Sequence, residues 1–102
     1  MDAPLISVVM TAYNAEKFIR KSIESVLNQT YENLQFIIVN DGSTDSTEAI
    51  VSEFSDSRIE YYSLGENCHI AHATNVGFSK VKGEYIAIID SDDLWDADKL
   101  KK

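Results

Sequence analysis

Four residues near the end of the chain, Asp90-Ser91-Asp92-Asp93, have side chains that could bind a metal ion. The three carboxylates directly follow the apolar run 85–89, and they repel one another there. Mg²⁺ and Mn²⁺ prefer carboxylate oxygens, with phosphates and waters completing the coordination shell. On an extended strand, residues i and i+2 share a face, so Asp90 and Asp92 could hold one ion together. Such an ion would bind a diphosphate and offset its charge.

Hydrophobic periodicity predicts the elements that position these residues. We expect strands at 5–10, 34–39, 58–62 and 84–89, and helices at 15–29, around Ile50, Val51 and Phe54, and at 70–80. Asn14 is the predicted N-cap of the first helix, and Asp45 with Glu48 resembles a capping box for the second. Gly83 is expected to end the third helix. The alternation predicts an α/β fold with a doubly wound, mainly parallel open sheet of Rossmann-like type.

A parallel sheet brings the ends of its strands to one edge, and open α/β sheets bind their ligands there. Three segments are predicted to meet at that edge: Thr11-Ala12-Tyr13-Asn14, Asn40-Asp41-Gly42-Ser43 and Asp90-Ser91-Asp92-Asp93. Asp41 could accept hydrogen bonds from a base or a sugar, and Tyr13 offers a flat face to a nucleobase. An isolated acidic run is as readily explained by turns and solvated charge. Two acidic strand ends on one edge favour a binding site.

Composition narrows the class of protein. The chain has 102 residues and a net charge of −8, which suits one small domain and disfavours non-specific binding of nucleic acid. No apolar run approaches the roughly 18 residues of a membrane span, and the start has no basic segment typical of a signal peptide. The single cysteine, Cys68, excludes an internal disulfide, and we expect a cytoplasmic location.

Other familiar sites are missing from the sequence. No glycine-rich phosphate loop follows the first strand, so a bound phosphate would depend on a metal. His69 and His72 could share a helix face, but surface or capping roles are commoner for such a pair. Trp95 is expected to pack against the core rather than stack on a substrate.

The motifs V-x-T-A-Y-N, V-N-D-G-S-T-D, N-x-G and D-S-D-D, spread over essentially the whole chain, resemble those of family 2 glycosyltransferases with the GT-A fold. The likeness is to the N-terminal half, which binds the nucleotide sugar. It implies that Thr11 and Tyr13 contact the nucleoside and that Asp41 binds the base, typically uracil. It also implies that Asp92 is the principal ligand of Mn²⁺ or Mg²⁺, with Asp90 beside the ribose or the metal. The remaining donor-binding positions implied by the motifs are Ala12, Ser43 and Ser91.

The resemblance also implies what the protein does. Family members transfer a sugar from a nucleoside diphosphate donor, here a UDP-sugar, to a hydroxyl of a glycan or a lipid-linked acceptor. Their catalytic base lies in an acceptor-binding half, which we expect beyond Lys102. Residues 1–102 are therefore expected to be one donor-binding domain, inactive alone, from a longer enzyme that could lie at the inner membrane face. Two departures from the family pattern are His69 and Thr74, where a glycine and an arginine are common.

Other functions share some of these features. A non-catalytic, Mg²⁺-binding receiver-like signalling module is also small and acidic, but it needs acids after the first strand, where this chain has Thr11-Ala12-Tyr13-Asn14. A haloacid-dehalogenase-type phosphatase carries its Asp-x-Asp after the first strand rather than the fourth. A nucleotidyltransferase can share the metal chemistry. A folded fragment that forms a homodimer through an exposed sheet edge is the remaining possibility.

Overall fold

The computed structural model describes residues 4–67, 70–97 and 99–101 of the chain. Its strands are β1 (Ile6–Ala12), β2 (Leu34–Asn40), β3 (Ile59–Ser63) and β4 (Tyr85–Asp90). Its helices are α1 (Ile19–Leu27), α2 (Thr47–Ser52) and α3 (Ile70–Ser79), followed by a short 3₁₀ helix, η1 (Lys99–Lys101). The predicted alternation of strands and helices is confirmed.

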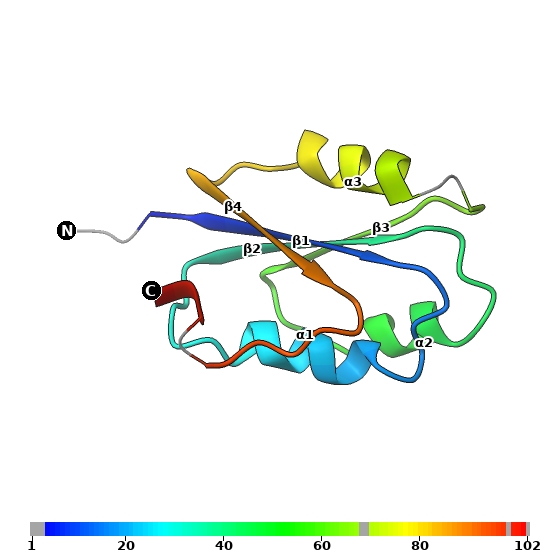
Figure 1. Cartoon of the computed structure of the whole chain (residues 1–102), viewed down its shortest axis with the longest axis horizontal. Helices are drawn as coiled ribbons and strands as arrows, with labels where there is room; N and C mark the ends of the chain where they lie inside the picture. The colour runs from blue at the N-terminus through cyan, green and yellow to red at the C-terminus, as the bar shows by residue number, and fades with distance from the viewer. Residues whose placement is uncertain (1–3, 68–69, 98, 102) are drawn as a thin grey trace.

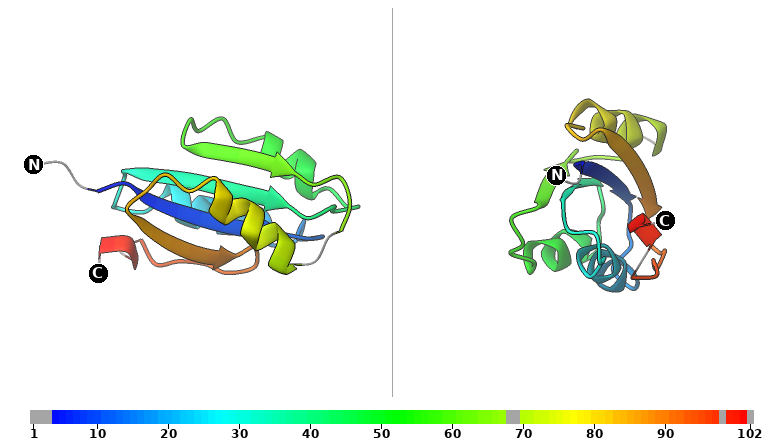
Figure 2. Two further views of the ribbon diagram at one scale, coloured as in Figure 1. Left: turned by 90° about the horizontal axis from the view of Figure 1, so that it is seen from above. Right: turned by 90° about the vertical axis from the view of Figure 1, so that its left-hand side faces the viewer.

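All four strands are parallel, in the order β3-β2-β1-β4. Helices α1 and α2 cover one face of the sheet and α3 covers the other (Figure 1), so the predicted doubly wound fold is confirmed. The view from above shows β1 between β2 and β4 (Figure 2). The chain adds strands outward from β1 to β3 and then returns to place β4 on the opposite side of β1. The strand order therefore reverses between β1 and β4, where open sheets form their binding crevice.

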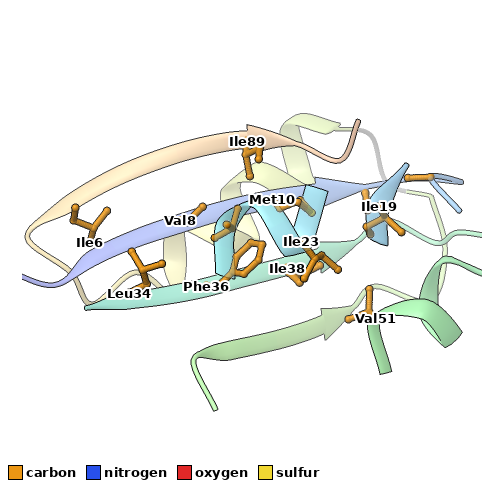
Figure 3. Packing of buried hydrophobic residues seen from close by; sticks show 13 residues of the cluster. Ile6, Val8, Met10, Ile19, Ile23, Leu34, Phe36, Ile38, Val51 and Ile89 are labelled. Carbon is orange, nitrogen blue, oxygen red and sulfur yellow. The ribbon is translucent and has the colours of Figure 1, made fainter. Parts of the chain in front are cut away.

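The core lies on both faces of the sheet because β1 and β2 are buried on both faces. Figure 3 shows Val8 and Met10 of β1 gathered with Ile23 of α1 on one face. On the other face, Val9 packs with Ala73 of α3. This double burial explains why both strands are almost continuously apolar in sequence.

Helix α3 approaches β1 closely because Gly77 has no side chain. A Cβ atom at this position would lie 2.6 Å from Val9 Cγ1 and 3.5 Å from Val39 Cγ2. Valine side chains have few alternative rotamers, so the helix itself would have to move away from the sheet. Gly77 thus sets the spacing between α3 and the sheet.

A buried polar pair fixes the start of β4 at the opposite end of the sheet from the predicted site. Ser7 Oγ donates to Gln35 Oε1 (2.6 Å) and accepts from the Gly83 amide (2.8 Å). Gln35 Oε1 also accepts from the Lys82 amide (2.8 Å), and its Nε2 donates to the Lys80 carbonyl (2.8 Å). These bonds hold the α3–β4 connection against β1 and β2, and so fix the register at which β4 begins.

Two predicted helix caps are wrong. Helix α1 begins at Ile19 rather than Ala15, with Phe18 at the N-cap position, and Asn14 is instead held by the neighbouring loop. Helix α2 has Ser46 at its N-cap and no side-chain cap bond. Asn14 and Glu48 both make contacts with distant parts of the chain in place of the predicted capping bonds. Asn14 lies in the segment 14–16, which packs against residues 43–47. Glu48 accepts a hydrogen bond from the Tyr61 hydroxyl.

No helix in the described part of the chain is both long and apolar enough to cross a membrane.

Gly77→Ala is expected to destabilise the protein, although alanine normally favours a helix by up to 1 kcal/mol over glycine. The added methyl would force α3 away from Val9, and we expect a loss of roughly 1–3 kcal/mol in the free energy of unfolding. Urea denaturation measures this change. Asn75→Ala, on the exposed side of the same helix, is the control and should be neutral or slightly stabilising. Equal effects of the two substitutions would contradict the close-packing role of Gly77.

Candidate functional site

A cleft of about 460 Å³ opens at the carboxyl ends of β1, β2 and β4. Its lining combines small, aromatic and acidic side chains: Thr11, Ala12, Tyr13, Asn14, Ala15, Phe18, Asp41, Asp90, Ser91 and Asp92. Tyr13, Asp41 and Asp92 come from three different loops and line this one cavity. The ends of β1, β2 and β4 therefore meet at one cleft, as the parallel sheet predicts.

The pairing of β1 with β4 forms the middle of the cleft. Thr11 is the register partner of Asp90 on one side and of Val39 on the other. Ala12 is buried and pairs with Asn40, the residue before Asp41. Small residues at the end of β1 leave room between the β2 loop and the acidic end of β4, where a ligand can approach the backbone.

The acidic end of β4 has the geometry of a cation site. Asp90, Asp92 and Asp93 are all exposed, and one carboxylate oxygen from each lies within 4.8 Å of the other two. Three such oxygens fit a hard divalent cation, whose open positions would be filled by phosphate or water. Asp90 and Asp92 also line the cleft, so a cation bound by this pair would face the cavity.

Helix α1 holds the acidic loop in place. The buried Ser22 hydroxyl donates to the Ser91 carbonyl (2.8 Å), and the Asp93 amide donates to the Asp90 carbonyl (3.0 Å), which closes a turn. Further along, Gln29 Nε2 donates to the Asp96 carbonyl (2.6 Å). The segment after β4 therefore runs back along α1 (Figure 1).

Trp95 belongs to this returning segment and packs, partly buried, against the main core. The predicted packing role of Trp95 is confirmed. Lys99 places its ammonium 5.6 Å from the centre of the indole ring, which adds a cation–π contact.

Asp41 is the most enclosed acidic residue of the cleft, with only 3% of its surface exposed. Its amide donates to the Ala12 carbonyl (2.8 Å), which joins the β1 and β2 ends. Gly42 follows with φ +72°, and a Cβ there would lie 2.2–2.3 Å from the backbone of Glu66 and Asn67. Only glycine lets the 66–67 loop pack this closely behind Asp41.

Two aromatic side chains are exposed at the cleft: Tyr13 (50%) and Phe18 (55%). The sequence predicts a role for Tyr13 but not for Phe18, because Phe18 falls within the helix predicted at 15–29; in the structure Phe18 is the N-cap residue of α1. A signal was present, because Phe18 lies off the apolar stripe formed by Ile19, Ile23 and Val26. A residue off this stripe does not point into the core between α1 and the sheet.

Ser43 does not line the cleft, unlike the other predicted donor-binding residues. Its hydroxyl accepts a hydrogen bond from the Asn14 amide (2.9 Å) instead. A direct contact between Ser43 and a donor stays a prediction.

Asp45 adds a charged group to the loops beside the cleft. Desolvation raises the pKa of Asp45, but hydrogen bonds from the Thr47 hydroxyl, the Thr47 amide and the Glu16 amide together outweigh it, so the pKa lies below its ordinary value. The carboxylate form of Asp45 is therefore the form that ties residues 16 and 47 together.

The predicted histidine pair and the two departures from the family pattern are only partly described. Cys68 and His69 lie outside the described residues, whereas His72 is exposed and Thr74 is half-buried on α3. None of the described residues of α3 lines the cleft.

Comparison with known proteins gives three kinds of match. The family model described as glycosyl transferase family 2 matches residues 7–102. A UDP-Glc:alpha-D-GlcNAc-diphosphoundecaprenol beta-1,3-glucosyltransferase, WfgD from Escherichia coli, is 45% identical over 99% of this chain. The putative teichuronic acid biosynthesis glycosyltransferase TuaG from Bacillus subtilis is 42% identical over 97% of this chain. This chain spans 40% of the length of each of these two relatives.

Solved structures of other proteins also match this chain. Staphylococcus aureus TarS 1-349 in complex with UDP-GlcNAc matches with a TM-score of 0.88 and 29% identity, over 94% of this chain and 29% of that one. The mannosyltransferase PcManGT from Pyrobaculum calidifontis, in complex with GDP-Man and Mn2+, matches with a TM-score of 0.88 and 27% identity. That match covers 95% of this chain and 30% of PcManGT.

Ser22→Ala is expected to loosen the acidic loop, because it leaves the Ser91 carbonyl without its donor. We expect a loss of about 1–3 kcal/mol in the free energy of unfolding, measured with urea, and faster amide exchange at Asp93. Ser25→Ala is the matched control, since the Ser25 hydroxyl donates only within α1, to the Ser22 carbonyl. Unchanged exchange at Asp93 in the Ser22 variant would contradict the anchoring role of Ser22.

Proposed function

The chain belongs to glycosyl transferase family 2, as its motifs predicted, and from this premise we propose that it binds the donor in a metal-dependent glycosyltransferase. The donor would be a nucleoside diphosphate sugar, and the longer protein would transfer the sugar to an acceptor hydroxyl. One observation carries the proposal: Tyr13, Asp41 and the Asp90–Asp92 pair line a single cleft at the switch point of the sheet.

Each part of the cleft has a chemical role in this proposal. The exposed ring of Tyr13 supplies a face for the base, and the enclosed carboxylate of Asp41 accepts hydrogen bonds from it. Thr11, Ala12 and Ser91 line the same cleft, and the ribose and diphosphate would fit against them. Asp92, with Asp90, would hold Mn²⁺ or Mg²⁺. The cation supplies the positive charge that balances the diphosphate and the charge of the departing nucleotide.

A UDP-sugar is the donor we favour over a GDP-sugar. WfgD is named for a UDP-Glc donor, and TarS is bound to UDP-GlcNAc, whereas PcManGT is bound to GDP-Man. The 45% identity with WfgD exceeds the 27% identity with PcManGT.

The acceptor and the catalytic base belong to the rest of the proposed enzyme. This chain spans 40% of the length of WfgD and of TuaG, so most of each relative lies outside the matched region. We therefore infer that residues 1–102 bind the donor without transferring the sugar, and that a later segment supplies the base and a glycan or lipid-linked acceptor site. The predicted cytoplasmic location and the placement at the inner membrane face stay predictions.

The receiver-like alternative fits the structure less well. Receiver domains share the flavodoxin-like strand order 2-1-3-4-5, in which β1 lies beside β3. Here β1 lies between β2 and β4, and the acids follow the edge strand β4 instead of β1. The acids that a receiver needs after its first strand are therefore missing, because β1 is followed by Tyr13 and Asn14.

The main test is a thermal shift of the 102-residue chain with UDP and Mn²⁺. Ligand at ten times its dissociation constant stabilises the folded state by about 1.4 kcal/mol, so we expect the melting temperature to rise by about 5–10 °C. Asp92→Asn should abolish the shift, because it removes a charged ligand of the cation. Glu84→Gln removes one exposed charge just before the other end of β4, and it should leave the shift intact. A native chain unaffected by millimolar UDP and Mn²⁺ would refute the proposal.

The predicted homodimer is a separate proposal about the exposed edge of the sheet. Within the described part of the chain, strand β4 pairs with β1 alone, and Tyr85, Ile86 and Ile88 are more than half exposed. A second copy could pair with this edge and cover these apolar groups. Light scattering of the 102-residue chain should then give the mass of a dimer at high concentration, and a lower dimer fraction for Ile88→Lys. A monomeric mass at every concentration would contradict the pairing.

A further inference from the structure

The turn after β1 contains an unusual backbone conformation. Among the described residues other than glycine, Asn14 alone has a positive φ, at 49°. Residues with a Cβ atom avoid this left-handed region, and asparagine tolerates it better than most. Such conformations persist where surrounding contacts enforce them. Asn14 follows Tyr13 directly, so this conformation sets the path of the chain out of the cleft.

The contacts that enforce this conformation come from the loop after β2. The Asn14 amide donates to Ser43 Oγ (2.9 Å), and Asn14 Oδ1 accepts from the Thr44 amide (2.8 Å). The next residue continues the connection, because the Ala15 amide donates to Thr47 Oγ1 (2.9 Å). The main chain and the side chain of Asn14 are therefore both engaged by residues 43–44.

Ser43 is itself fixed from the sheet. The Ser43 amide donates to Asn40 Oδ1 (3.1 Å), and Asn40 Nδ2 donates to the Tyr61 hydroxyl of β3 (2.9 Å). That hydroxyl donates to Glu48 Oε1 (2.8 Å). Asn40 is buried and directly precedes Asp41. The same relay that fixes Asn14 thus also fixes the backbone at Asp41.

We propose that Asn14 is a positioning residue of the donor cleft: its left-handed conformation, held by Ser43 and Thr44, places Tyr13 opposite Asp41. Ser43 acts in the same way, through Asn14 rather than by touching the donor. The inference rests on the proposed function, because the pair that Asn14 aligns is the proposed nucleobase site. Asn14 and Ser43 would thus affect the affinity for the donor through the conformation of the cleft.

The energetic cost of the left-handed conformation sets the expected loss of UDP affinity. In the protein without ligand, alanine at position 14 would leave the left-handed region. The penalty of that region for an ordinary residue lowers the population of the left-handed conformation roughly tenfold. Apparent affinity falls in proportion to the population of the competent conformation. Glycine adopts the same φ without strain, so it should restore most of the affinity although it also lacks the amide side chain.

The experiment measures the dissociation constants of UDP with Mn²⁺, and of Mn²⁺ alone, by calorimetry on the 102-residue chain. Asn14→Ala should raise the constant for UDP about tenfold, and Asn14→Gly by less than about threefold. Both should leave the constant for Mn²⁺ alone within twofold, because Asp90 ends β4 and Asp92 lies in the loop after it, which Ser22 holds in place. Ser7→Ala is the stability control: it breaks the buried pair at the far end of the sheet and should lower the melting temperature without changing the affinity for UDP.

A double-mutant comparison separates the two roles open to Ser43. If Ser43 acts through Asn14, Ser43→Ala combined with Asn14→Ala should weaken UDP binding no more than Asn14→Ala alone. Additive losses would mean that Ser43 contacts the donor, and would overturn its positioning role.

Two further results would overturn the proposal for Asn14. One is UDP affinity within twofold of native in Asn14→Ala. The other is an equal loss in the alanine and glycine variants, which would indicate a direct contact of the amide. Failure of the proposed function looks different, because then the native chain itself would not bind UDP with Mn²⁺, and the positioning role would fall with it.

Discussion

The parallel pairing of β1 with both β2 and β4 is the constraint on which the rest of the structure depends. It places β1 inside the sheet, and it brings the carboxyl ends of β2 and β4 to the same edge, one on each side of the end of β1. Because the order of the strands reverses at β1, the loops diverge there and leave a cleft between them. The cleft is therefore a consequence of the connectivity, and its lining depends on which residues end the strands.

Hydrogen bonds between loops then give the cleft its shape. The α1 hydroxyl of Ser22 fixes the acidic loop after β4, and residues 43–47 fix the turn after β1. The buried pair Ser7–Gln35 fixes the start of β4 at the opposite end of the sheet. Most of these polar contacts are buried or half-buried, and the one between the Asn14 amide and Ser43 is exposed. In a small domain each such bond is worth about 1 kcal/mol of a total stability of about 5–15 kcal/mol. Small changes in a few polar side chains can therefore alter the geometry of the cleft.

Charge distinguishes the two sides of the cleft. The β4 side carries three exposed carboxylates whose mutual repulsion a divalent cation would relieve, whereas the β1–β2 side has one enclosed carboxylate, Asp41, beside an exposed ring. A nucleoside diphosphate has a matching polarity: a base that hydrogen-bonds and stacks at one end, and a diphosphate that needs a cation at the other. This match underlies the proposed donor site.

The sequence by itself determined the class of fold, the order of the elements, the identity of the family and the three segments that meet in the cleft. These depend on the period of apolar residues and on short motifs, which are local properties of the chain. Only the tertiary structure decided the caps of α1 and α2, the place of Phe18, and the partner of Ser43. The Asn14 side chain could satisfy either a local helix end or a loop far away in sequence, and the packing of residues 14–16 against 43–47 selected the distant partner. The Asp45 carboxylate binds both, because it accepts from Thr47 at the start of α2 and from the Glu16 amide. A choice between competing hydrogen bonds depends on the positions of both loops in space, which no local pattern contains.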